Sequence, residues 1–186
     1  MMEQDEMSHD NITLVGMPGA GKSTLGVVLA KKLGYRFVDT DLLLQESEGM
    51  LLSQLIEQRG IEGFIEAENA LLAGLSCEHH VIATGGSAVY GDEGMRNLAS
   101  QGHVLYIRTT LEELRTRLHM DLLDRGVVMR HATTLQELYD ERTPLYERYA
   151  TLVVDTVGMT THEAVEALAA ALRDAGVEPL PSDEDG

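Results

Sequence analysis

The segment Gly16–Ser23, GMPGAGKS, constrains the fold more than any other, because it fits G-x-x-x-x-G-K-[ST] at every fixed position. The strand-like run ITLV precedes it, and the helix-compatible run TLGVVLAKKL follows it. In this context the pattern predicts a phosphate-binding loop, where backbone N–H groups and a helix N-terminus surround phosphate oxygens. We therefore expect a nucleotide-binding domain.

The same motif predicts roles for single side chains. Lys22 can reach the β- and γ-phosphates, and the Ser23 hydroxyl can bind Mg²⁺. The reaction is not determined by this loop, since ATPases, GTPase switches and small-molecule kinases share it. The nucleotide-binding residues expected from the motif are Gly16, Gly19, Ala20, Gly21, Lys22, Ser23 and Thr24.

Short apolar runs rich in Val and Ile alternate with amphipathic stretches, which predicts buried parallel strands joined by helices. We expect an α/β fold, a three-layer doubly wound parallel sheet of five strands. Ligands bind such sheets at the carboxyl ends of the strands. The expected strands are residues 11–16, 35–39, 80–84, 103–108 and 150–155, and the expected helices are Lys22–Leu33, Leu51–Leu75, Glu93–Ser100, Leu111–Leu118, Leu135–Tyr149 and Thr161–Ala175.

The charge is strongly negative, with 14 basic and 31 acidic residues and a net charge of −17. Nine of the acids lie in residues 1–10 and 174–186, which leaves about −8 for the body. We expect one domain over residues 11–175 between disordered acidic tails, 1–10 and 176–186. Nucleic acid and anionic membranes are disfavoured as partners. An acidic N-terminus unlike a signal peptide indicates a cytoplasmic protein, and we expect a monomer.

Two carboxylates, Asp39 and Asp41, follow the second expected strand. In an extended segment, positions i and i+2 face the same side, here beside the phosphate-binding loop. One carboxylate would then hold Mg²⁺ and the other would orient or deprotonate an acceptor hydroxyl. The alternative is an Asp that caps the helical run starting at Leu42, which is common after strands. This pattern alone leaves both interpretations open.

With these motifs, the chain resembles the shikimate kinase family of P-loop small-molecule kinases, over nearly all of residues 11–175. Further similarity lies in FIEAE (64–68), similar to the family's F-R-x-x-E, and in GGSAV (85–89), similar to its G-G-G-A-V. DRGV (124–127) is similar to the start of the family's lid, and ERTPLY (141–146) to its x-R-x-P-L-Y. The resemblance implies a nucleoside-monophosphate-kinase-like fold with a mobile lid at about 120–133.

The resemblance also implies ATP and Mg²⁺ as cofactors and a small hydroxylated acid as the substrate. Asp39 would hold the metal through water, Arg117 would pack on the adenine, and Arg125 would close over the γ-phosphate. The implied catalytic residues are Lys22, Asp41 and Arg125, and the implied nucleotide site adds Arg117 to the loop residues. The implied metal ligands are Ser23 and Asp39. The implied acceptor site consists of Asp41, Ile65, Gly85, Gly86, Ser87 and Arg142.

The chain departs from the family at the acceptor side. Ile65 stands where the family has a substrate-binding arginine, Ser87 replaces the third glycine, and the lid reads R-G-V-V instead of R-P-L-L. Of the arginine pair that clamps the substrate carboxylate, only Arg142 remains. Three interpretations stay open: a shikimate kinase in which Arg59 or Arg130 compensates, a kinase for another hydroxylated acid such as homoserine, or a nucleotide-binding regulatory module.

Overall fold

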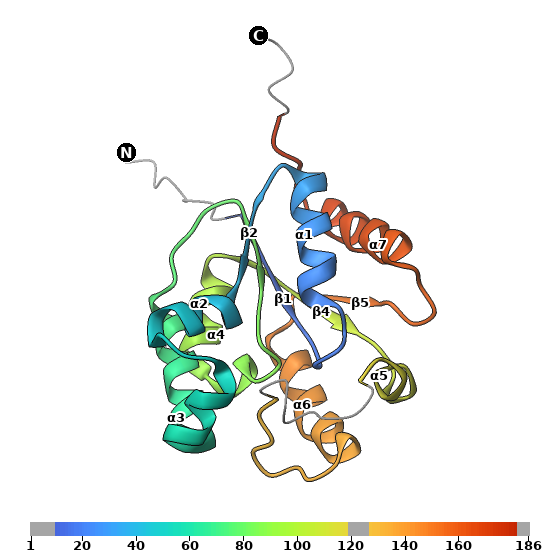
Figure 1. Cartoon of the computed structure of the whole chain (residues 1–186). Helices are drawn as coiled ribbons and strands as arrows, with labels where there is room; N and C mark the ends of the chain where they lie inside the picture. The colour runs from blue at the N-terminus through green and yellow to red at the C-terminus, as the bar shows by residue number, and fades with distance from the viewer. Residues whose placement is uncertain (1–9, 119–126, 182–186) are drawn as a thin grey trace.

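The computed structural model describes residues 10–118 and 127–181, and its centre is one parallel sheet with strand order β2-β3-β1-β4-β5 (Figure 1). This confirms the predicted α/β fold class, and β1 lies in the middle of the sheet, directly before the phosphate-binding loop. The strands are β1 (Asn11–Val15), β2 (Arg36–Asp39), β3 (His80–Ala83), β4 (Gly102–Arg108) and β5 (Leu152–Asp155).

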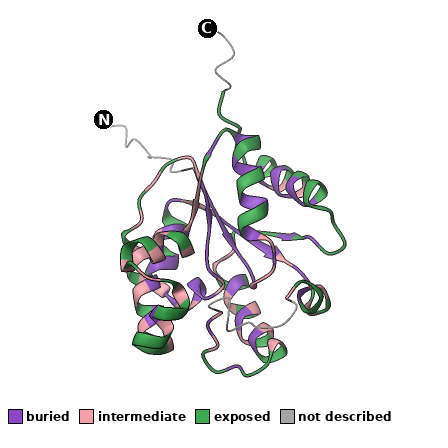
Figure 2. Ribbon diagram, in the orientation of Figure 1, coloured by how far each residue is buried: buried purple, intermediate pink, exposed green. Residues whose placement is uncertain are grey.

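Helices cover both faces of the sheet, so the side chains of the central strand are buried on both sides (Figure 2). Ile12 and Leu14 of β1 belong to a core cluster that includes residues of α1 and α7. Val15 belongs to a second cluster, which includes residues of α3, α4, α5 and α6. This alternation follows from the two-residue period of a strand, and it explains the continuous apolar runs of the sequence.

The helices are α1 (Lys22–Leu33), α2 (Thr40–Glu48), α3 (Leu52–Gly74), α4 (Asp92–Ser100), α5 (Leu111–Arg117), α6 (Leu135–Tyr149) and α7 (Thr161–Asp174), with a 3₁₀ turn η1 (Ala88–Tyr90). The six expected helices are present with ends within one residue. α2 and η1 are additional. The expected helix over 51–75 is interrupted at Gly60, whose φ of 71° and ψ of 178° are not helical.

α7 begins at Thr161 as expected, and one detail after it differs from the sequence analysis. Thr160 caps the helix, because its hydroxyl accepts from the Glu163 amide while the Glu163 carboxylate accepts from the Thr160 amide. The prediction of a disordered tail beginning at residue 176 is wrong for its first residues. Val177 is buried in the core, and the Leu180 amide donates to the Leu33 carbonyl at 2.8 Å.

Three expectations concern residues outside the described ranges: the tail over 1–9, the end of the second tail over 182–186, and the lid residues 120–126, including Arg125. Within the described residues, no helix is both long and apolar enough to span a bilayer.

Candidate active site

A cavity of about 360 Å³ opens at the carboxyl ends of the central strands, where the fold predicts a ligand site. One end of this cavity, which we call the donor end, is formed by the phosphate-binding loop with Lys22, Ser23 and Thr24. The other, the acceptor end, is formed by Asp41, Gly85–Ser87, Val127–Val128 and Arg142. Segments far apart in sequence therefore meet in one site.

Lys22 begins α1 and is 8% exposed. Its ammonium group donates to the carbonyls of Gly16 at 2.7 Å and Met17 at 2.9 Å, so the side chain lies along the loop. Burial lowers the pKa of Lys22 to about 8, although the nearby carboxylate of Asp41 opposes this shift. A buried cation at the start of a helix favours an anionic ligand, because both attract negative charge.

Ser23 and Asp39 form the donor set expected for a metal. The Ser23 hydroxyl donates to Asp39 Oδ2 at 2.6 Å, while Asp39 Oδ1 accepts from the backbone amides of Asp41 and Leu42. The capping alternative is therefore correct for Asp39, and it is compatible with the metal role because the two oxygens have different partners. Among the described residues no group of three or more His, Cys, Asp or Glu is placed to hold a metal.

Asp41 lies in the first turn of α2, since that helix already begins at Thr40. The expected extended arrangement of Asp39 and Asp41 is wrong in this respect. The cap at Asp39 starts the helix, and the helical turn directs Asp41 into the cavity. Burial raises the pKa of the Asp41 carboxyl, the charge of Asp39 raises it further, and Lys22 opposes both effects. A carboxylate with a raised pKa is a better proton acceptor.

Gly85 and Gly86 follow β3 and have side chains packed closely against them. A Cβ at Gly85 would lie 2.6 Å from Asp41 Oδ1 and 2.7 Å from Glu68 Oε1. A Cβ at Gly86 would lie 2.8 Å from Arg142 Nη1. Any larger residue would displace these groups, so the two glycines allow the carboxylates of Asp41 and Glu68 and the guanidinium of Arg142 to approach the same stretch of backbone.

Ser87, the next residue, forms a hydrogen bond with a buried carboxyl group. Its hydroxyl donates to Glu68 Oε2 at 2.6 Å, whereas Glu68 Oε1 is buried with no hydrogen-bond partner. Burial raises the pKa of Glu68 to about 7, and the Ser87 hydrogen bond opposes the shift. Ser87 therefore supplies a partner to a buried carboxyl group behind the acceptor end.

Arg142 is the buried cation of the acceptor end, at 1% exposure. Its Nη2 donates to the Val128 carbonyl at 2.5 Å and its Nε to the Tyr90 hydroxyl at 3.2 Å. Within residues 10–118 and 127–181 it has no ion-pair partner. A buried guanidinium without a carboxylate is costly unless a ligand provides the anion.

Ile65 stands in an apolar cluster with Leu44, Phe64 and Val128, and it is 8% exposed. It does not belong to the residues that line the cavity. Neither arginine proposed as a substitute lines it either. Arg59 forms an ion pair with Glu48, and Arg130 forms two hydrogen bonds with Glu62. In the described residues, Arg142 is thus the only arginine of the acceptor end.

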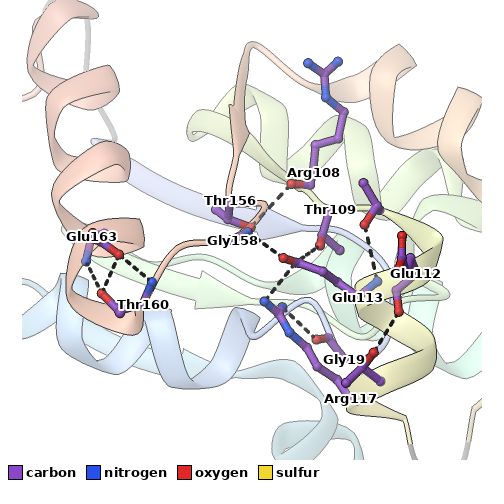
Figure 3. Close-up of polar contacts among 12 residues, drawn as sticks. Gly19, Arg108, Thr109, Glu112, Glu113, Arg117, Thr156, Gly158, Thr160 and Glu163 are labelled. Atoms are coloured by element: carbon purple, nitrogen blue, oxygen red, sulfur yellow. Dashed lines mark hydrogen bonds and ion pairs between the residues drawn. The ribbon is translucent and has the colours of Figure 1, made fainter.

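A second cavity, of about 240 Å³, adjoins the phosphate-binding loop on the side of α7. Arg117, at the end of α5, lines it and donates to the Gly19 carbonyl at 3.4 Å and to Glu113 at 3.1 Å (Figure 3). Glu113 also accepts from the Gly158 amide, which joins α5 to the loop after β5. The cavity is open to the phosphate-binding loop, so its position suits the base of a nucleotide.

Sequence reasoning missed several residues that line these cavities or lie next to them. Thr156, Met159 and Thr160 line the second cavity, and the rule that ligands bind at strand ends could have found them after β5. Glu68 lay within a quoted motif without a role. For Tyr90 the sequence offered no signal, because the hydrogen bonds of its hydroxyl group are with residues more than 50 positions away.

Comparisons with known proteins agree on one family. The family model described as shikimate kinase matches residues 18–173. A shikimate kinase of Vibrio parahaemolyticus is 39% identical over 149 residues, 78% of this chain and 86% of that protein. Shikimate kinase 2 of Serratia proteamaculans is 36% identical over 170 residues, 87% of this chain and 95% of that protein. The solved structure of Acinetobacter baumannii shikimate kinase in complex with shikimate has a TM-score of 0.81 at 28% identity, and covers 91% of this chain and 96% of that one.

Proposed function

Because this chain belongs to the shikimate kinase family, we propose that it transfers the γ-phosphate of ATP to a hydroxyl group of shikimate. The observation that carries the choice of acceptor is Arg142, a buried guanidinium at the cavity with no ion-pair partner among the described residues. It suits a carboxylate, and Asp41 in the same cavity suits a hydroxyl group.

At the donor end, the phosphate-binding loop and Lys22 hold the phosphates of ATP. The ammonium group of Lys22 neutralises charge on the transferring phosphoryl group, which is the main requirement in phosphoryl transfer. Arg117 and the loop after β5 hold the base in the second cavity, next to Gly19. The two cavities share Gly19, Gly21 and Thr24, as a ligand that spans both requires.

The hydroxyl of Ser23 and the carboxylate of Asp39 fit Mg²⁺, which prefers hard oxygen ligands and retains several waters. When bound, Mg²⁺ offsets the negative charge of the phosphate oxygens.

At the acceptor end, Arg142 holds the carboxylate of shikimate while Asp41 receives the proton of the reacting hydroxyl. The hydroxyl oxygen forms a bond to the γ-phosphorus, and the bond between that phosphorus and the β-phosphate oxygen breaks, so ADP leaves. Asp41 is well suited to this role, because its raised pKa increases its basicity. The expectations of a monomer and of a cytoplasmic location stay predictions.

The test is a coupled assay of ADP formation with separate acceptors: shikimate, homoserine, gluconate and no acceptor. We expect turnover with shikimate at a KM in the micromolar to millimolar range usual for enzymes. Turnover with homoserine or gluconate and none with shikimate would overturn the choice of acceptor, as the replacement of an arginine by Ile65 allows. ATP binding without turnover on any acceptor would indicate a regulatory module.

A further inference from the structure

The orientation of Arg142 depends on one residue that neither the motifs nor the comparisons assign. Tyr90 ends the 3₁₀ turn η1 and is half-buried. Its hydroxyl accepts from Arg142 Nε at 3.2 Å and donates to the carboxylate of Glu141. One tyrosine therefore contacts two successive residues of α6, which limits rotation of the Arg142 side chain about its long axis.

The ring of Tyr90 adds a second restraint. The Arg142 guanidinium carbon lies 5.1 Å from the ring centroid, and that of Arg130 lies 5.6 Å from it. Both distances are within the range of cation–π attraction. The charge of Arg130 is already paired with Glu62 through two hydrogen bonds. Arg130 therefore packs against the ring without competing with Arg142 for the carboxylate of the acceptor.

The other two nitrogens of the Arg142 guanidinium lie beside residues that line the cavity. Nη2 reaches the Val128 carbonyl, while Nη1 lies beside Gly86, which lines the acceptor end. Because Nε is occupied by Tyr90, the edge of the guanidinium that faces Gly86 is the one available to a ligand. Tyr90 thus selects which edge of the guanidinium faces the cavity.

A fixed orientation matters more for a single arginine that binds a carboxylate than for one of two arginines that bind it together. A guanidinium binds a carboxylate well when its plane is fixed in advance, because less conformational entropy is then lost on binding. Ile65 provides no second cation, and Tyr90 packs against the same apolar cluster that contains Ile65.

We propose that Tyr90 is a positioning residue that holds the guanidinium of Arg142 for the carboxylate of the acceptor. This inference rests on the proposed function, and it concerns a specificity-determining contact that acts through Arg142 without touching the reacting atoms.

The test is Tyr90→Phe, which removes the hydroxyl and keeps the ring, compared with Tyr90→Leu, which removes both. We expect KM for shikimate to rise about tenfold in Tyr90→Phe, as for loss of one hydrogen bond to a charged group, and further in Tyr90→Leu. Values of kcat and of KM for ATP should change by less than about twofold, because uniform binding energy is lost. The matched control is Tyr149→Phe, whose hydroxyl donates to the carboxylate of Asp92; its KM for shikimate should be unchanged.

A double-mutant cycle separates positioning from general support of the fold. In an Arg142→Gln background, Tyr90→Phe should have no further effect on KM for shikimate, since the group that it positions is gone. The same tenfold effect in both backgrounds, or equal losses in kcat and in KM for ATP, would overturn the inference. An unchanged KM in Tyr90→Phe and Tyr90→Leu would also overturn it. Failure of the wild-type protein to phosphorylate shikimate would instead reject the proposed function.

Discussion

The donor end and the acceptor end of the cavity are built in different ways. The donor end comes from one continuous segment, and its contacts are largely with backbone atoms, as in the hydrogen bonds from Lys22 to the carbonyls of Gly16 and Met17. The acceptor end comes from four separate segments, α2, the segment after β3, Val127–Val128 and α6, and its charged groups are the side chains of Asp41 and Arg142. A site made of backbone tolerates sequence change around it, whereas a site made of side chains changes with each substitution.

The departures from the family that the sequence predicts fall on one side of this contrast. The donor end matches the motif at every fixed position, while Ile65 and Ser87 lie at or behind the acceptor end. Ser87 donates to the buried Glu68, and Tyr90 contacts Arg142. The charged groups at and behind the acceptor end therefore depend in part on neighbouring side chains for their hydrogen bonds.

The largest expected effect is at the donor end. Lys22→Ala should lower kcat by about 10³-fold, because a preorganised charge beside the transferring phosphate is lost. The control is Lys31→Ala, an exposed lysine of the same helix. Steady-state kinetics with saturating ATP and shikimate measure the change. A decrease smaller than about tenfold would place the essential charge elsewhere.

At the acceptor end, Asp41→Asn should lower kcat by about 10²-fold, since the amide keeps the shape but cannot accept the proton. Asp140→Asn, an exposed carboxylate on α6, makes the same charge change away from the cavity. We expect little change in KM for ATP, so the two ends can be separated. Equal kcat in Asp41→Asn and the wild type would remove Asp41 from the proton transfer.

The pH dependence should also distinguish the two ends. Lys22 has a pKa lowered to about 8, so in the free enzyme its charge is present below pH 8 and is lost above it. The kcat/KM for ATP should therefore fall about tenfold per pH unit above pH 8. A profile of kcat/KM from pH 7 to pH 10 measures it, and a flat profile up to pH 9.5 would show that the Lys22 charge is not lost there.

The smallest expected effect is on stability. The pKa of Glu68 is raised from 4.5 to about 7, so ionisation in the folded state costs free energy, and the wild-type stability falls as pH rises through this range. Glu68→Gln cannot ionise. Its free energy of unfolding, relative to that of the wild type, should increase by about 1 kcal/mol between pH 6 and pH 8. Urea denaturation measures it, with the exposed Glu66→Gln as a control that should show no such trend.

Features that depend on one continuous segment could be predicted from the sequence, whereas contacts between distant segments could not. The phosphate-binding loop, the five strands and Lys22 follow from local patterns, and the structure agrees with them. The start of α2 at Thr40 was missed because it depends on Asp39 acting as a cap, which the sequence left as one of two alternatives. The Ser87 contact with Glu68 and the Tyr90 contact with Arg142 depend on tertiary packing across 19 and 52 positions, which no local pattern reports.

The choice of acceptor depends on Arg142, whose guanidinium has no ion-pair partner in residues 10–118 and 127–181 and is proposed to recognise the carboxylate of the acceptor. Comparing kcat/KM for shikimate with that for its carboxamide, in the wild type and in Arg142→Gln, tests it most directly. We predict that the wild type prefers the acid by about 10²-fold, the value of a charge-assisted contact, and that Arg142→Gln loses most of this preference. An equal preference for the acid in both proteins would contradict the account.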